Sequence, residues 1–198
     1  TGGSTGPQTN LMQSVTQPGA TLTDMGFTRD AVYSPNGVSM CSKFSRQLTA
    51  KLAGVDPYGA TWQQYFGSSA TETLGNFRRQ GALTAENMSP AQARQKTNML
   101  KEGDVVFLYY GNSNIDHIGV YDGKGHIIQH SLPQFRGQAV QGNVNVMSVD
   151  DYLSKAGRAT VSFGRIPQVA GSTAQAPAKS PPAPRPAAQP AAKQGPAQ

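Results

Sequence analysis

The sequence feature that most constrains the fold is a pair of short apolar segments joined by a glycine-rich turn. Residues 118–121 and 126–130 flank Asp-Gly-Lys-Gly at 122–125. An Asp-Gly pair between two such segments is among the strongest local signals for a β-hairpin. Segment 104–110, Asp-Val-Val-Phe-Leu-Tyr-Tyr, is equally β-prone, and turn residues follow it at 111–114. The centre of the chain therefore predicts an antiparallel meander.

Helical patterns surround this sheet. After Cys41, the apolar residues Phe44, Leu48 and Leu52 recur at intervals of four, and Gly54 supplies a helix stop. Helices first and an antiparallel sheet afterwards predict an α+β fold. Shorter helices are predicted at 71–80, after Ser89-Pro90 and from a capping box at 148–151 to about Gly157, and a last strand at 159–166.

Composition divides the chain into three parts. Residues 1–24 are polar and without periodicity, which predicts an arm that is ordered only when it docks. Residues 169–198 hold seven of the fourteen prolines and no aromatic residue, so this end predicts a disordered Pro/Ala-rich tail. The folded domain is therefore expected at 25–168. The single cysteine excludes an intrachain disulfide.

Charge and hydropathy exclude several functional classes. Half of the net charge of +6 comes from Lys179, Arg185 and Lys193 in the tail. The rest is too small to indicate a nucleic-acid-binding protein, although it suits an anionic polymer such as a bacterial cell wall. No apolar run approaches transmembrane length, and no signal pattern opens the sequence. Because the chain begins at Thr1, the lack of an export signal excludes little.

Cys41 and His117 are the candidate catalytic pair. Cys41 stands at a predicted helix N-terminus, where backbone N–H groups and the helix dipole stabilise a thiolate. His117 opens a predicted strand, where an imidazole is well placed to share the thiol proton. The alternatives are a buried structural cysteine and an ordinary edge-strand histidine. A zinc site of three histidines is disfavoured, because His126 and His130 are about 13 Å apart along a strand.

Three blocks of the sequence together resemble the NlpC/P60 cysteine peptidases. These are Cys41-Ser-Lys-Phe at the helix start, Leu-Lys-Glu-Gly-Asp-Val-Val-Phe at 100–107, and Asp-His-Ile-Gly-Val-Tyr-Asp-Gly-Lys-Gly-His-Ile-Ile-Gln-His-Ser at 116–131. Their order and spacing match the family over roughly residues 30 to 135. The chain departs from the family at Met40, where an aspartate is usual, and at Lys43, where a glycine is usual. These departures indicate a divergent branch.

The resemblance implies a papain-like fold and a set of site residues. Cys41 would be the nucleophile and His117 the base, with a third polar residue orienting the imidazole. Gapless spacing places that third residue at Gln129, whereas a one-residue shift would give His130. Strand alternation puts these two on opposite faces, so only one can serve, and the spacing favours Gln129. Tyr33 is the upstream candidate for oxyanion support.

The resemblance also implies a reaction, hydrolysis of an amide bond in the peptide stem of peptidoglycan. This chemistry needs no metal and no organic cofactor. Its site of action is extracytoplasmic, as a secreted, periplasmic or virion-delivered protein, with a slight preference for a phage wall-penetrating enzyme or an antibacterial toxin. A toxin would have an immunity or inhibitor protein as a further partner. The alternatives are a papain-like transferase or deamidase with the same dyad, and a non-catalytic binding or virion module.

Overall fold

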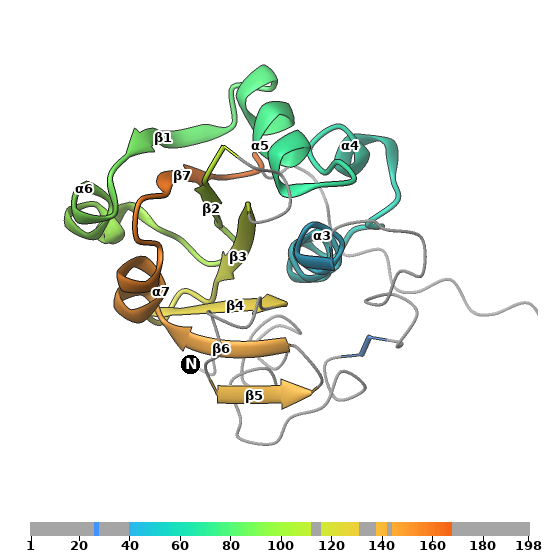
Figure 1. Ribbon diagram of the computed structural model, residues 1–198. Coiled ribbons are helices and arrows are strands. Elements are labelled where there is room, and N and C mark those ends of the chain that lie inside the picture. The colour runs from blue at the N-terminus through green and yellow to red at the C-terminus, as the bar shows by residue number, and fades with distance from the viewer. Residues whose placement is uncertain (1–25, 28–39, 112–115, 131–137, 142–143, 168–198) are drawn as a thin grey trace, which may run out of the picture.

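The computed structural model describes residues 26–27, 40–111, 116–130, 138–141 and 144–167 (Figure 1). The helices are α3 (Met40–Ala53), α4 (Ala60–Gln63), α5 (Ala70–Arg79), α6 (Pro90–Gln95), the 3-10 helix η1 (Thr97–Met99) and α7 (Val149–Lys155). The strands are β1 (Leu83–Met88), β2 (Val105–Tyr109), β3 (His117–Tyr121), β4 (His126–His130), β5 (Gln138–Gln141), β6 (Val144–Ser148) and β7 (Thr160–Gly164).

The strands of the described residues form one antiparallel sheet in the order β1-β7-β2-β3-β4-β6-β5. In Figure 1, α3, α4 and α5 gather on one side of the sheet, while α6 and α7 lie on the other. The α+β class predicted from the sequence is confirmed.

The meander prediction holds only for β2, β3 and β4. β7 does not extend this meander but returns to pair with β2, so that it lies between β2 and β1. The sequence interpretation missed β1, β5 and β6 altogether. β1 carries Glu86 and Asn87 and pairs with only one neighbour, so its apolar pattern is weak, as expected for an edge strand.

α3 forms where the apolar spacing predicts it. Phe44 and Leu48 are fully buried and Leu52 nearly so, and this face of the helix packs against β3 and β4. The helix ends at Ala53 because Gly54 adopts a φ of 68°, a left-handed conformation that closes a helix at little cost for glycine. The predicted helix boundary at Gly54 is therefore correct.

Two apolar layers cover the two faces of the sheet. On one side, Phe77 of α5 packs edge-on against Phe107 of β2, with ring centroids 5.1 Å apart. On the other, α7 buries Tyr152 completely against the sheet. α7 begins where its sequence predicts, because the Ser148 hydroxyl accepts a hydrogen bond from the backbone N–H of Asp151. The first layer also contains Cys41 of α3, and the second contains Tyr152 of α7.

Candidate active site

Cys41 is the second residue of α3, and its position is held by its neighbours. The hydroxyl of Ser42 donates to the backbone carbonyl of Gly67 at 2.8 Å and lies 2.8 Å from the hydroxyl oxygen of Thr73. Cys41 itself is buried in the apolar cluster that contains Ile118, the residue next to His117. No acidic residue stands in the first turn of α3, so no carboxylate there competes with a thiolate for the positive end of the helix dipole.

His117 opens β3 and is buried, with 1% of its surface exposed. Its Nε2 lies 2.5 Å from Oε1 of Gln129, which is fully buried on β4. An amide oxygen only accepts hydrogen bonds, so Nε2 carries the ring proton in the neutral imidazole. The arrangement therefore leaves Nδ1 as the basic nitrogen of the ring.

The strand register explains why these two side chains meet. Val120 pairs with Ile128, and continuing this register places Gly119 opposite Gln129 and His117 on the diagonal. Gly119 is required there, because a Cβ at that position would overlap the Cγ2 methyl of Ile127. The absence of a side chain at residue 119 thus leaves room for Ile127 and for the ring of Tyr152 on this face of the sheet.

Gln129 has a second partner that the sequence interpretation did not identify. Its Nε2 donates to Oδ1 of Asn145 on β6 at 3.3 Å, and these two residues are direct cross-strand partners. Asn145 is buried as well. The signal that could have revealed it is an amide between Val144 and Val146 in an otherwise apolar strand.

His130 lies on the opposite face of β4 from Gln129, as strand alternation requires. It is paired in register with Val144 and is buried. The structure thus brings Gln129 into hydrogen-bond contact with His117 and directs His130 elsewhere. His130 still acts on His117 through its charge, which disfavours the protonated form of that ring.

Tyr152, which was also not identified from the sequence, lies beside His117. Its ring centroid is 6.1 Å from that of His117, with 40° between the ring planes. Burial raises the pKa of Tyr152 well above its ordinary value, and the charges of Cys41 and Tyr110 raise it further. Because the charge of Cys41 acts on Tyr152 and the ring of Tyr152 lies beside that of His117, Cys41 belongs to the same neighbourhood as the imidazole.

The environment of His117 keeps the imidazole neutral. Burial lowers its pKa most, the hydrogen bond that the ring donates to Gln129 raises it, and the charge of His130 lowers it, so that the pKa is about 4. Burial dominates because the surroundings solvate a cation poorly. At neutral pH the ring is therefore a neutral proton acceptor.

The other sequence candidates have different positions. Tyr33 lies outside the described residues. Asp116 points away from the imidazole and accepts hydrogen bonds from Thr71 Oγ1 at 2.5 Å and from the N–H of Tyr110 at 2.7 Å. It therefore ties α5 to the end of β2. No group of histidine, cysteine and acidic side chains in the described part of the chain has the arrangement of a metal site.

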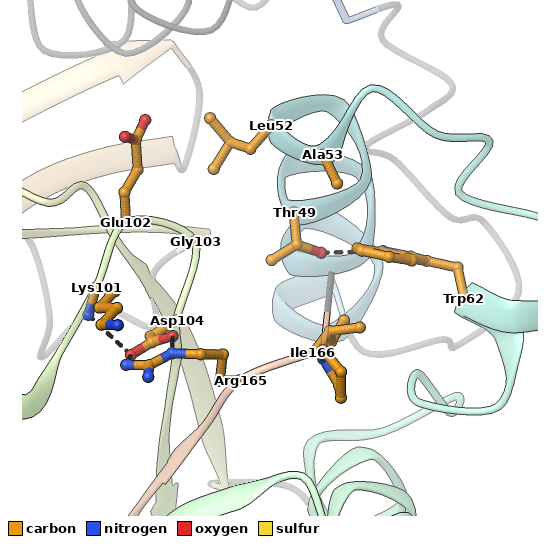
Figure 2. A pocket seen from close by; sticks show the side chains of 11 residues that line it. Thr49, Leu52, Ala53, Trp62, Lys101, Glu102, Gly103, Asp104, Arg165 and Ile166 are labelled. Carbon is orange, nitrogen blue, oxygen red and sulfur yellow. Dashed lines mark hydrogen bonds and ion pairs between the residues drawn. The ribbon is translucent and has the colours of Figure 1, made fainter. Parts of the chain in front are cut away.

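A cavity of about 440 Å³ lies beside the C-terminal half of α3, away from Cys41. Figure 2 shows its two walls, with Thr49, Leu52 and Trp62 on one side and the Asp104–Arg165 ion pair on the other. Cys41 and Leu52 are eleven residues apart, or about 16 Å along the helix axis. The cavity is therefore separate from the neighbourhood of Cys41 and His117.

The geometry agrees with the comparison to known families. The sequence model of the NlpC/P60 family matches residues 25–148. The chain belongs to the NlpC/P60 family. Proteins of this family are generally peptidases and amidases of the cell wall, so the match indicates cysteine peptidase or amidase chemistry. No curated protein matches the chain significantly.

Family membership confirms the resemblance and the papain-like core predicted from the sequence. The matched NlpC/P60 region contains Cys41, His117, Gln129 and Asn145. It ends at the last residue of β6, before α7 begins, so Tyr152 is contributed by a segment beyond it. Within the described residues, no helix has both the length and the apolar character needed to cross a membrane.

Proposed function

We propose that this NlpC/P60 domain is a cysteine hydrolase that cleaves amide bonds in the peptide stem of bacterial peptidoglycan. The observation that carries the proposal is the buried His117–Gln129 pair, which leaves Nδ1 as the ring base in the neighbourhood of Cys41 at the start of α3. Family membership supplies the reaction class. Cys41 is the nucleophile, His117 the general acid and base, and Gln129 the residue that orients the ring.

The reaction proceeds in two steps. Nδ1 of His117 takes the proton of the Cys41 thiol, and the thiolate attacks the carbonyl carbon of the scissile amide. The backbone N–H of Cys41 at the helix start donates to the developing oxyanion. The imidazolium then protonates the leaving amine as the C–N bond breaks, which leaves a thioester. A water molecule, deprotonated by His117, hydrolyses the thioester and restores the thiol.

The substrate sets where this chemistry takes place. A stem peptide is reached from outside the cytoplasm, so the proposed site of action is extracytoplasmic, in a secreted, periplasmic or virion-delivered protein. A positive net charge of +6 favours association with an anionic wall polymer. The proposed roles are an antibacterial toxin or a phage wall-penetrating enzyme, and a toxin would require an immunity or inhibitor protein.

The test is mass spectrometry of purified muropeptides incubated with the protein, with Cys41→Ala as the matched control. Hydrolysis gives fragments whose masses sum to that of the substrate plus one water, and the control gives none. An intact stem in which one carboxamide has become a carboxyl group, with one water taken up and one ammonia released, would instead show a deamidase, and joined stems would show a transferase. Unchanged muropeptides, with a Cys41 thiol that alkylates only after denaturation, would refute the catalytic proposal.

A further inference from the structure

We propose that Asn145 is a positioning residue that fixes the amide orientation of Gln129 and, through it, the tautomer of His117. This inference rests on the proposed function, because it assigns a role to Asn145 within the same site. It extends that function to β6, a strand that holds neither the nucleophile nor the base.

The starting point is that a glutamine amide has two orientations of nearly equal shape and opposite chemistry. Its oxygen accepts a hydrogen bond and its nitrogen donates one. With Oε1 toward His117, the ring must carry its proton on Nε2, and Nδ1 remains basic. With the amide reversed, Nε2 must accept and the proton moves to Nδ1. The reversed orientation therefore removes the base from the proposed reaction.

Gln129 alone does not select between these orientations. The selection comes from its second contact, since Gln129 Nε2 donates to Asn145 Oδ1 at 3.3 Å while Gln129 Oε1 faces His117 at 2.5 Å. With Asn145 in the orientation seen in the structure, reversing the Gln129 amide would place two oxygen atoms against each other. Gln129 is 0% exposed and Asn145 4% exposed, so solvent does not readily replace the lost bond. Leaving buried amide groups unsatisfied disfavours the reversed form by about tenfold or more.

The sequence around Asn145 supports a specific role. Its neighbours Val144, Val146 and Met147 are all buried and apolar, so a β-branched residue would fit the strand at lower desolvation cost. The pairing of β4 with β6 places Asn145 directly opposite Gln129. The side-chain oxygen of Asn145 thus lies next to the amide nitrogen of Gln129, the group whose orientation it fixes.

The tautomer of His117 can be measured directly by imidazole ¹⁵N chemical shifts at neutral pH, without substrate. The wild-type protein should show the proton on Nε2. Asn145→Leu, which has a similar branched shape and no acceptor, should give a mixture of the two tautomers and lower kcat about twofold with KM unchanged, because only the Nε2–H form keeps Nδ1 as the base. Asn145→Asp retains an acceptor oxygen and should keep the wild-type tautomer. Met147→Ala weakens the same strand on the same face and should leave the tautomer unchanged.

Asn145→Leu with wild-type tautomer and wild-type kcat would overturn the assignment. If that variant does not fold, the wild-type protein still decides, because the side-chain amide protons of Gln129 must exchange slowly if Asn145 holds them. Rapid exchange would overturn the assignment as well. The tautomer and exchange measurements need no turnover, so they remain valid if muropeptides are not cleaved. Failure of the proposed function is therefore distinguishable from failure of this inference.

Discussion

The burial of His117 as a neutral ring should make the stability of the domain depend on pH. The pKa of its imidazole is about 4 in the folded protein, whereas the ordinary value is 6.5. As the pH falls below 6.5, the unfolded chain binds a proton that the folded protein does not bind until the pH is near 4. The contribution of His117 to stability is therefore complete above pH 6.5 and is lost progressively down to about pH 4.

The size of this loss follows from the two pKa values. Each unit of difference corresponds to about 1.4 kcal/mol, so the full effect is about 3 kcal/mol. Between pH 7 and pH 4.5 most of it is developed, about 2.5 kcal/mol in the free energy of unfolding. A glutamine at position 117 has no titration in this range and lacks the effect.

The assay is urea unfolding at pH 7 and pH 4.5, carried out with Cys41→Ala and with Cys41→Ala/His117→Gln. Removing the thiol prevents a thiolate from holding a proton on the ring. Other titrating groups, including His130, whose burial also lowers its pKa, are present in both proteins and cancel in the comparison. The protein that retains His117 should lose about 2.5 kcal/mol more than its partner. Equal losses would refute the view that the ring is buried in its neutral form.

Three further predictions follow from the site. Cys41 should alkylate with iodoacetamide well below the free-thiol pKa of about 8.5; reaction only in denaturant would show a structural cysteine. Gln129→Ala should lower kcat by one to three orders of magnitude or so while leaving Cys41 alkylable, whereas His130→Ala should cost little in rate; reversed results would give the orienting role to His130. Gly119→Ala should destabilise the domain by about 1–3 kcal/mol in urea unfolding, because its Cβ overlaps Ile127; an unchanged midpoint would show that the strands can move apart.

The parts of the fold that were predictable depend on local signals. Residues 104–110 and 118–130 specify β2, β3 and β4, because a tight turn between apolar segments leaves few alternatives. The interval of four residues from Phe44 to Leu52 likewise specifies α3. By contrast, the placement of β7 next to β2 depends on pairing between residues 51 to 59 positions apart, which no local pattern encodes.

The residues of the candidate site likewise fall into those that the sequence indicates and those that only the structure shows. Cys41, His117 and Gln129 became candidates because three short blocks carry them at a spacing that resembles the NlpC/P60 family. Asn145 and Tyr152 were missed because each reaches the site only through tertiary packing, one across a strand pair and the other from α7. A polar residue in an apolar strand marks Asn145, but only the strand order shows that its partner is Gln129.

The position of β7 also has a consequence for biosynthesis. Both edges of this strand are used, since it pairs with β2 on one side and β1 on the other, and it is the last strand of the described chain. During translation, Val105 and Leu83 emerge long before Gly164, their common partner. Until β7 emerges, the backbone groups of β1 and of the β2 edge that will face β7 are unpaired, and such groups are prone to association with other chains. The sheet cannot be completed until β7 has left the ribosome, so a producing cell would have an interval in which the nascent domain is unassembled.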